Sequence, residues 1–476
     1  MPQHHARRLA WFAPLPPVRS GIAQYNTELL PGLASAHSVE LFVDGHPDQF
    51  VRPDARIPLY NAHDFVWKHL RQPYDLIVYQ LGNAPCHDYM WAYLARYPGL
   101  VVLHDGQLHH ARGRGLLAQK RADDYRSEFA FNHPGVQLAI AELGIAGLLG
   151  SLTYLWPMRR VVIESARLIA VHNQWLADQI REEHPDAQVS VLDMGVPVPA
   201  LPADAGPIIR ARHGIPRETV LFLALGDVTP EKRISQAIRG LASLVHARPP
   251  ATPVPDVHLL LAGKTVDHYD AEAEARALGV ADRVTLAGFV PHEDVAAYVD
   301  AADVCLCMRW PSSRETSAAW LRCLAGARPT VTTDLVHMVD IPAYDPRTWT
   351  ILHAPAGAGK TMPLASAEPA CVSVDINDED HSLGLAMRRL ASDPHLRALL
   401  GRRARQLWLE RFTLDRMVAE YLELLDAACT SPIPARARLA QLPAHFGTRG
   451  TEHATRLLRE MGWPVSRITE VWRGQV

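Results

Sequence analysis

Cysteine is scarce in this 476-residue chain, and the spacing of its six cysteines excludes two classes of protein. There is no C-x-x-C pair, and the spacings fit neither a disulfide framework nor a zinc site. Cys305 and Cys307 alternate within an apolar run, so we expect both thiols on one buried face of a strand. This cysteine usage is typical of a reducing compartment, and we expect a cytoplasmic location.

A surplus of charge of one sign is missing too. The formal net charge is -3, and 48% of the residues are apolar, which is ordinary for a globular protein with a sizeable core. No global basic field is present to attract nucleic acid, so we expect no nucleic-acid partner. The apolar residues after Arg7 are too few for a signal peptide and run into prolines, so they predict a first strand from Arg8 to Ala13.

One segment is apolar over nearly the length of a membrane span. Residues 136–157 are almost wholly apolar, and Arg159 and Arg160 follow them. A span needs about 20 apolar residues, whereas Gln137, Glu142 and three glycines dilute this run. We expect a buried or interdomain helix here. Peripheral contact with the inner face of a membrane is the second interpretation, and a transmembrane span is the least favoured.

Short apolar runs alternate with stretches of helical periodicity along most of the chain. This alternation predicts an α/β protein with parallel sheets covered by helices. Ligands of such sheets bind at the carboxyl ends of the strands, so the polar residues directly after the runs are the candidates for a site. The runs are residues 76–82, 100–105, 168–173, 220–227, 257–263, 283–289 and 304–309.

A segment rich in proline, alanine and glycine, residues 191–207, separates two series of strands and helices. We therefore predict one domain at residues 1–196 and a second at residues 197–412. Within the first domain, residues 106–165 are interpreted as a helical insertion.

The C-terminal part of the chain is expected to be helical. Asp393 suits a helix cap and Pro394 a first helical position, and the helical pattern reaches Leu425. Residues 431–476 form a tail rich in proline and arginine, with an amphipathic stretch near residues 452–461.

Two segments have the features of a phosphate site. Ser20 and Gly21 follow the first strand and open a helix, where backbone amides favour an anion. Gly226 ends a strand, and Lys232 and Arg233 are expected to open the next helix as a clamp for a diphosphate. A plain strand–helix turn and a solvated basic pair are the structural alternatives.

Histidines gather after the run at residues 100–105. His104 and Asp105 stand where a strand should end, and His109 follows. A histidine in such a place acts as a base, a hydrogen-bond donor or a metal ligand. The spacing H-x4-HH matches no common ligand set, so we expect no metal. Substrate contact is favoured here over a structural loop.

The segment 304–331 combines a buried strand, a proline–serine loop and a helix start. Arg309 ends the strand, and Glu315 with Thr316 and Ser317 is expected to begin the helix. Ser313 suits the cap, with Thr316 or Ser317 as alternatives. Amides at this helix start would face an anionic ligand. Glu315 also suits the helix dipole without any ligand, which is its structural alternative.

In order, spacing and residue type, these four segments resemble glycosyltransferase family 4, of the GT-B architecture. The resemblance covers roughly residues 8–425 and is strongest over residues 224–331. It implies two facing Rossmann-like domains with parallel sheets. The C-terminal domain would bind a nucleotide-diphospho sugar, the N-terminal domain would bind the acceptor, and a helix at residues 413–430 would cross back to the N-terminal domain.

The resemblance also implies roles for individual residues. His104, Lys232 and Glu315 are expected to be catalytic: His104 faces the sugar and acceptor, Lys232 neutralises the diphosphate, and Glu315 lies near the hexose hydroxyls. The donor-binding set is expected to be Ser20, Gly21, Gly226, Lys232, Arg233, Arg309, Glu315, Thr316 and Ser317, and the acceptor side is expected to hold His104, Asp105 and His109.

Two positions depart from the family pattern. The family often has two glutamates with seven residues between them, and the second typically grips the ribose. Arg322 takes the place of that second glutamate, and the place of the first falls on Arg314, one residue before Glu315. The arginine that accompanies the family's lysine falls near Asp227, so we expect Arg233 or Arg309 to supply the missing charge.

Residues and resemblance together predict a metal-independent hexosyltransferase that uses a nucleotide-diphospho sugar and needs no cofactor. The resemblance implies that the anomeric configuration is retained. The alternatives are a non-catalytic GT-B protein that binds a nucleotide sugar or glycan, and a GT-B phosphorylase or epimerase. The acceptor is not predicted, and residues 136–157 are compatible with a lipid-linked or membrane-proximal one without indicating it.

Two further motifs are interpreted as chance resemblances. Residues 354–361 resemble a phosphate-binding P-loop, but Ala354 stands where its first glycine is needed, and an NTP-hydrolysing switch that depends on Lys360 is the least favoured function. The acidic run at residues 375–380 would suit the metal-binding pair of the other major glycosyltransferase fold. We interpret it as the acidic start of a helix.

Overall fold

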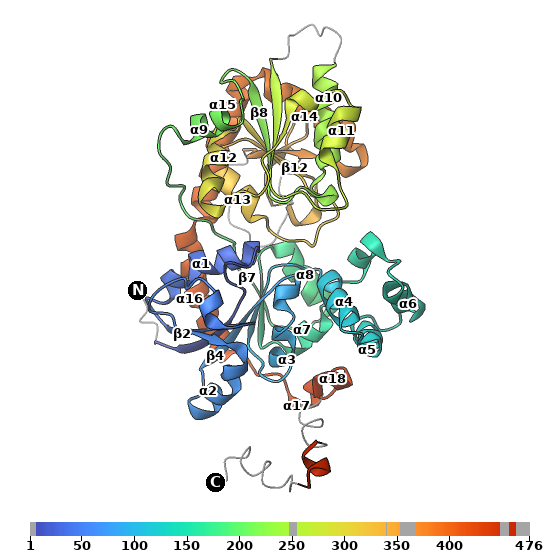
Figure 1. Ribbon diagram of the computed structural model, residues 1–476. Coiled ribbons are helices and arrows are strands. Elements are labelled where there is room, and N and C mark those ends of the chain that lie inside the picture. Colours follow the sequence, from blue (N-terminus) through green and yellow to red (C-terminus); the bar gives the residue numbers. More distant parts are fainter. Residues whose placement is uncertain (1–5, 247–254, 339, 353–367, 448–456, 463–476) are drawn as a thin grey trace.

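Two seven-stranded sheets, each built of parallel strands, organise the chain in the computed structural model, which describes residues 6–246, 255–338, 340–352, 368–447 and 457–462. The first sheet has the order β3-β2-β1-β4-β5-β6-β7 and the second β10-β9-β8-β11-β12-β14-β13. Helices flank each sheet, and the two units stack end to end (Figure 1).

The strands form where the sequence is most continuously apolar. Every residue of β4 and β5 is buried, because both faces of these central strands are covered. All seven predicted runs and the predicted first strand are confirmed, within a few residues at their ends. The strands are β1 (Arg8–Phe12), β2 (Ser38–Val43), β3 (Leu59–Asn61), β4 (Leu76–Leu81), β5 (Leu100–Leu103), β6 (Leu168–Val171), β7 (Val189–Val191), β8 (Val220–Leu225), β9 (Val257–Ala262), β10 (Val284–Leu286), β11 (Val304–Cys307), β12 (Thr330–Thr333), β13 (Ala343–Tyr344) and β14 (Cys371–Val374).

The helices lie between the strands and on their faces. Those of the first unit are α1 (Gly21–Leu33), α2 (Phe65–Arg71), α3 (Met90–Leu94), α4 (His109–Ala118), α5 (Ala122–Asn132), α6 (Ala139–Ile145), α7 (Arg160–Ser165) and α8 (Gln174–Glu183). Those of the second unit and the C-terminal part are α9 (Ala205–Arg212), α10 (Ile234–Val245), α11 (Ala271–Ala277), α12 (Val295–Ala301), α13 (Ala318–Ala325), α14 (Glu379–Ser392), α15 (Pro394–Arg411), α16 (Leu414–Thr430), α17 (Arg436–Leu439) and α18 (Ala444–Gly447).

Helix α16 crosses back from the second unit and packs on α1 of the first, as predicted (Figure 1). The hydroxyl oxygens of Tyr421 on α16 and Tyr25 on α1 lie 2.7 Å apart. Asp393 caps α15 through its side chain, also as predicted. The helical pattern that we expected to continue to Leu425 is divided into two helices. Helix α15 ends before Phe412, and Thr413 caps the next helix, α16.

The chain passes twice between the two units, and the two passages touch. Val196 N–H donates to the carbonyl of Phe412 at 2.9 Å, and Leu414 N–H donates to the carbonyl of Val196 at 3.1 Å. Gly195 permits this approach, because a Cβ at that position would overlap the carbonyl oxygen of Thr413. The predicted domain boundary at residues 196 and 197 stays a prediction.

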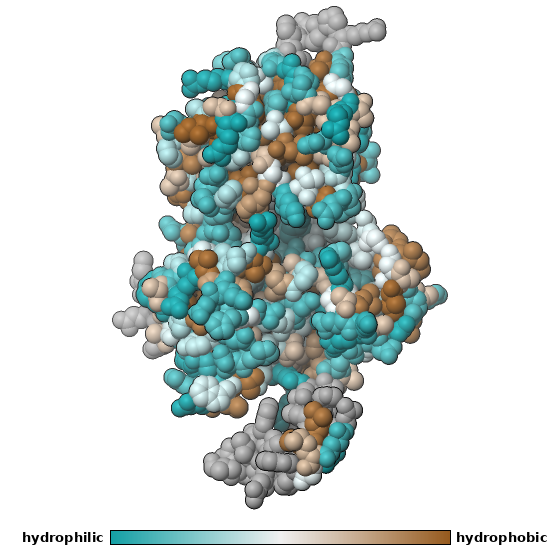
Figure 2. All heavy atoms as spheres, in the orientation of Figure 1, coloured by the Kyte–Doolittle hydropathy of each residue, from teal (hydrophilic) through white to brown (hydrophobic). Residues whose placement is uncertain are grey.

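The apolar segment 136–157 is not the buried helix that we expected. It forms the short helix α6 and a 3-10 helix, η4 (Gly150–Leu155), at the outer edge of the first unit. No helix among the described residues is long and apolar enough to cross a membrane. Apolar side chains gather on this part of the surface (Figure 2), and the exposed leucines are Leu138, Leu143, Leu148, Leu152 and Leu155.

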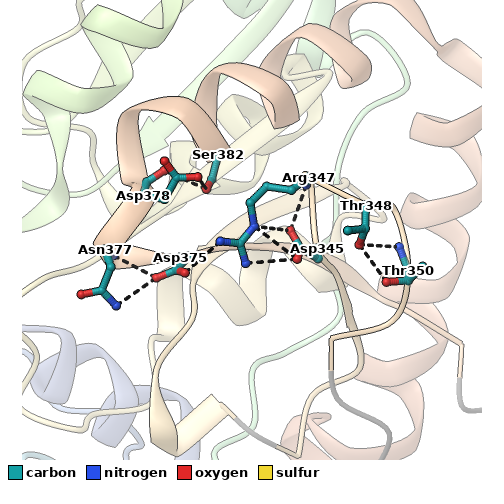
Figure 3. Close-up of polar contacts among 8 residues, drawn as sticks. All are labelled: Asp345, Arg347, Thr348, Thr350, Asp375, Asn377, Asp378 and Ser382. Atoms are coloured by element: carbon teal, nitrogen blue, oxygen red, sulfur yellow. Dashed lines mark hydrogen bonds and ion pairs between the residues drawn. The ribbon is translucent and has the colours of Figure 1, made fainter.

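The acidic run at residues 375–380 caps and begins a helix, as we interpreted it. Asp375 accepts a hydrogen bond from Asn377 N–H at 2.9 Å and pairs with Arg347 at 3.0 Å, while Asp378 accepts one from Ser382 (Figure 3). These contacts engage the carboxylates that a metal site would need. The P-loop-like motif at residues 354–361 lies outside the described residues. The same holds for residues 452–456 of the predicted amphipathic stretch, in which residues 457–460 are helical.

Candidate functional site

A cavity lies at the carboxyl ends of β8, β11 and β12, on the side of the second sheet that faces the first unit. This is the edge where open parallel sheets bind ligands. Its wall carries Lys232, Arg309, Glu315 and Ser317, four residues predicted for the site, together with Ala224, Leu225, Leu306, Cys307, Met308, Ser312, Ala319, Trp320, Thr332, Thr333, Leu335, His337 and Met338.

Lys232 lies against the end of β8 and does not open the following helix as expected. It belongs to a 3-10 helix, η5 (Pro230–Lys232), and its ammonium donates to the carbonyl of Leu225 at 3.0 Å. Burial, together with the positive charge of Arg309, lowers the pKa of Lys232 to about 8. Gly226 is required here, because its φ is +95° and an added Cβ would overlap the ammonium. The ammonium is thus held at the cavity wall.

Arg233 is directed away from this cavity, which corrects the expectation of a paired cationic clamp. It adopts a left-handed backbone conformation with φ of 58°, before α10 begins at Ile234. Its guanidinium Nε donates to the buried carboxylate of Glu379 on α14 at 2.9 Å. Arg309 is the arginine that lines the cavity.

Glu315 sits before the helix, in the loop that follows β11, and two side chains hold its carboxylate. Arg309 forms an ion pair with it, and Ser312 Oγ donates to it at 3.0 Å. The helix α13 begins at Ala318, and Ser317 caps it by accepting from Trp320 N–H at 3.3 Å. The cap expected at Ser313 is therefore wrong and the alternative at Ser317 is correct, so Glu315 is placed by its partners rather than by the helix.

The loop around Glu315 bridges the two units through three hydrogen bonds. Gly106 N–H donates to the carbonyl of Ser313 at 2.6 Å, and Asn173 Nδ2 donates to the carbonyl of Arg314 at 2.9 Å. Thr316 Oγ1 donates to the carbonyl of His172 at 3.1 Å. The carboxyl ends of β5 and β6 therefore meet the loop that carries Glu315.

Asp105 faces the Glu315 loop from the first unit. Its carboxylate accepts from Asn83 N–H at 2.7 Å. Burial, with the negative charge of Glu315 as the second cause, raises the pKa of Asp105 to about 7. The structure thus places the predicted carboxylate of Asp105 close enough to Glu315 for the charge of Glu315 to act on it, although Asp105 does not line the cavity.

His104 lies below the cleft in a buried chain of hydrogen bonds. Its Nε2 is 2.8 Å from the side-chain oxygen of Gln80, and its Nδ1 is 3.1 Å from Nε2 of His172. Gln80 in turn donates to the hydroxyl of Tyr421 on the crossover helix at 3.3 Å. Burial and the neighbouring histidines lower the pKa of His104 well below its usual value, so it is neutral. Both ring nitrogens are occupied by protein groups, unlike the direct contact with sugar and acceptor that we predicted.

His109 lies within the insertion and does not reach the cavity. Its ring is buried on α4, and Nε2 lies 2.7 Å from the hydroxyl of Tyr125 on α5. The prediction that His109 lies at the site is therefore wrong.

Ser20 and Gly21 lie at the start of α1, facing the second unit. Ser20 Oγ accepts from Ile22 N–H at 3.2 Å and caps the helix. A Cβ added to Gly21 would meet no atom within 4 Å, so the backbone there is open to a ligand. The neighbouring Arg19 stacks on the ring of Phe289 in the second unit, 4.3 Å from its centroid.

Two residues at the cleft were missed by sequence reasoning. Tyr154 belongs to the insertion, and burial followed by the charge of Glu315 raises the pKa of its phenol, which shows that the insertion reaches toward the Glu315 loop. His337 lines the cavity after β12. Neither residue has a motif around it, and only the fold brings them to the site.

The described part of the chain contains no group of three or more histidine, cysteine, aspartate or glutamate side chains placed to hold a metal ion. The ionisable wall of the cavity instead carries the cations Lys232 and Arg309 beside Glu315. Cationic side chains with a helix start match a phosphate-bearing ligand.

Comparison with solved structures gives the fold. Sucrose-phosphate synthase from Thermosynechococcus elongatus superposes with a TM-score of 0.58 at 15% identity, over 88% of this chain and 98% of that one. HepE from Anabaena, in complex with UDP and glucose, superposes with a TM-score of 0.57 at 14% identity, over 88% of this chain and 100% of that one. A glycosyltransferase from Rickettsia africae superposes with a TM-score of 0.60 at 11% identity, over 90% of this chain and 100% of that one. The fold is GT-B.

A family model described as glycosyl transferases group 1 matches residues 218–354 of this GT-B chain. The matched segment contains Lys232, Arg309 and Glu315, the cavity residues of the second unit. No curated protein sequence is a significant match. The GT-B fold and the group 1 match together support a glycosyltransferase.

Proposed function

We propose that this GT-B protein transfers a hexose from a nucleotide-diphospho sugar to an acceptor, with retention of anomeric configuration and without a metal ion. The observation that carries the proposal is the cavity in which Lys232, Arg309 and Glu315 meet, opposite Asp105 of the facing unit. The group 1 match over the same residues supports it.

Lys232 is proposed to stabilise the leaving diphosphate. Its ammonium is fixed by Leu225 before any ligand arrives, so little reorganisation is needed when negative charge develops. An anion beside Lys232 would raise its pKa from about 8 and keep it charged. Arg309 and the amides at the start of α13 are proposed to share the diphosphate, and the open backbone at Gly21 is proposed to approach it from the other unit.

Glu315 is proposed to orient the donor sugar, and Asp105 the acceptor hydroxyl. The pair Arg309 and Ser312 fixes one face of Glu315, which leaves its orientation defined in advance. His104 is proposed to act as a positioning residue, because its ring nitrogens are bound to Gln80 and His172 and it directly precedes Asp105, on which the charge of Glu315 acts.

Donor binding tests the proposal. Titration calorimetry with UDP-, GDP- and ADP-sugars in the presence of a chelator should show one class of donor that binds the wild type. Lys232→Met should weaken that donor at least about 10-fold, since a hydrogen bond to a charged group is lost. Lys264→Met, which removes an exposed lysine outside the cavity wall, should bind normally. If no donor binds, or if both variants bind like the wild type, the proposal fails.

A non-catalytic nucleotide-sugar binding protein is the second candidate. The ion pair between Arg309 and Glu315 favours it, because the carboxylate that would touch the sugar is already neutralised. The two functions differ in one observable. A binding protein shifts the thermal stability with a donor but never releases nucleoside diphosphate, whereas a transferase does both.

We also propose that the acceptor is lipid-linked and that the exposed leucines in residues 138–155 rest on the membrane surface. An exposed apolar surface of this kind suits a lipid interface. Flotation with phospholipid vesicles should recover the wild type but not Leu148→Glu/Leu155→Glu. Leu70→Glu, which alters an equally exposed leucine on α2, should float normally. Equal flotation of all three would contradict this part of the proposal.

A further inference from the structure

His337 is a titratable residue of the cavity wall to which the proposed function gives no role. It lies in a 3-10 helix, η8 (Val336–Met338), which follows β12 and packs against α8 of the first unit. Its side chain is 7% exposed, so it is almost fully enclosed at the junction of the two units. The same cavity wall carries Lys232 and Glu315.

The Nδ1 atom of His337 is buried and has no hydrogen-bond partner among the described residues. The ionisable neighbours on the wall differ in this respect. Lys232 is bound to the carbonyl of Leu225, and Arg309 is bound to Glu315. The imidazole of His337 lines the cavity, and a buried polar atom without a partner carries a free-energy cost that a hydrogen bond from a ligand would remove.

The charge state of His337 narrows which part of a donor it contacts. Burial lowers its pKa to about 4, against the opposing influence of Glu315, while Arg314 lowers it further and Asp340 raises it. The imidazole is therefore neutral at pH 7, and it adds no positive charge for a diphosphate. A neutral imidazole nitrogen pairs well with a hydroxyl group, which both donates and accepts.

We propose that Nδ1 of His337 hydrogen-bonds a hydroxyl group of the donor sugar and helps to select among sugars that differ at that hydroxyl. The assignment rests on the proposed function, because it requires a nucleotide sugar in this cavity. Within that function it adds a specificity-determining residue beside Glu315. A site built to pair with a substrate hydroxyl rejects analogues that cannot pair, because the buried group is then left unsatisfied.

Three substitutions separate this role from a structural one. His337→Asn keeps a polar atom near the position of Nδ1, His337→Gln moves it toward the position of Nε2, and His337→Leu removes it. Val336→Ala is the matched control, since it alters the half-exposed neighbour in the same 3-10 helix, which does not line the cavity. Calorimetry would compare UDP-glucose, UDP-galactose, GDP-mannose and ADP-glucose with UDP, GDP and ADP.

The expected result is a loss confined to the sugar. His337→Leu and His337→Gln should weaken the nucleotide sugar that binds the wild type about 5- to 30-fold, as expected for one hydrogen bond. His337→Asn and Val336→Ala should stay within about 3-fold of the wild type, a change smaller than the loss of one hydrogen bond. The affinity for the matching nucleoside diphosphate should not change in any variant, and discrimination between sugars should fall in His337→Leu.

Each other outcome is decisive. If the wild type binds no nucleotide sugar, the proposed function is overturned and this assignment with it. If a donor binds and His337→Leu binds it equally well, only this assignment is overturned. Equal losses for the nucleotide sugar and the nucleoside diphosphate indicate a structural role and also overturn it. Should His337→Leu fail to fold, the comparison of Asn with Gln decides, and equal affinities of those two reject the proposal.

Discussion

Arg322 on α13 contacts Glu28 on α1, with its Nη2 atom 2.7 Å and 3.0 Å from the two carboxylate oxygens. His292 adds a third contact, with Nε2 3.0 Å from the same carboxylate. The two helices belong to facing units, so this cluster ties the units together (Figure 1). Arg322 occupies the place where the second glutamate was expected, and it does not line the cavity. Its role in this chain is an interdomain contact.

The contact between Arg322 and Glu28 should be measurable as a coupling energy. Both side chains are less than one-fifth exposed, so solvent screens the pair only in part. A cycle of Glu28→Ala, Arg322→Ala and the double variant should give a coupling of about 1–2 kcal/mol in urea unfolding. A coupling of zero would show that the two charges do not stabilise the packing of the units.

Asp105 should make the stability of the protein fall as the pH rises from about 4 to about 7. Its folded-state pKa of about 7 lies above the ordinary value of 3.8, so the stability it contributes is complete below about pH 4 and is lost as the pH rises to about 7. Asp105→Asn stays neutral and should therefore gain melting temperature relative to the wild type across that window. Because Asp105 and Glu315 interact, the transition belongs to the pair.

The control for Asp105 is an exposed aspartate of the same unit. Asp48→Asn changes a side chain that is 90% exposed, and its difference from the wild type should not vary with pH in this way. A constant difference between Asp105→Asn and the wild type from pH 4 to pH 8 would show that Asp105 is not buried against Glu315.

Gly226→Ala should displace the ammonium of Lys232 and weaken donor binding. The added Cβ would overlap Nζ, and a non-glycine residue at φ of +95° is strained. Gly214→Ala carries the backbone strain alone, because its φ is +65° and no atom lies within 4 Å of the added Cβ. Both variants should lose about 1–2 kcal/mol of stability. Only Gly226→Ala should bind the donor at least about 10-fold more weakly. Similar donor affinities in the two variants would contradict the placement of Lys232.

Much of the fold was predictable because its central strands are buried on both faces. Such strands leave continuous apolar runs in the sequence, and the residues directly after them mark the carboxyl edge of the sheet. Lys232, Arg309 and Glu315 were found in this way, and the structure brings them to one cavity. Their roles stay predictions until a donor is bound.

The predictions for His104 and for the start of α13 were wrong for two physical reasons. One is the direction of side chains along a strand, and the other is competition among several residues that can cap a helix. His104 extends the ladder of β5 by donating to the carbonyl of Leu81, and successive side chains of an extended strand point to opposite faces. The ring of His104 is therefore buried against Gln80 and His172, while the carboxylate of Asp105 lies under the influence of Glu315. The helix start was misplaced because several residues from Ser313 to Ser317 suit a cap, and the hydrogen bond of Thr316 to His172 settles the choice through tertiary structure.

Contacts between distant residues left no signal in the sequence. Glu28 and Arg322 are 294 positions apart, and no sequence motif near either residue predicts the contact between them. The apolar segment 136–157 was expected to be buried, but hydropathy does not tell which surface an apolar side chain meets. His337 is set at the cavity wall by β12 and α8 together, and no single motif predicts it.

The most direct test of the account is nucleoside diphosphate release with a chelator present. Wild type, Glu315→Ala and Lys264→Met would be incubated with UDP-, GDP- and ADP-sugars and a lipid and carbohydrate extract as the source of acceptor. The account predicts release from one class of donor by the wild type and Lys264→Met, and a loss of about 100-fold or more in Glu315→Ala. Release that depends on added metal, or equal rates for Glu315→Ala and the wild type, would contradict it.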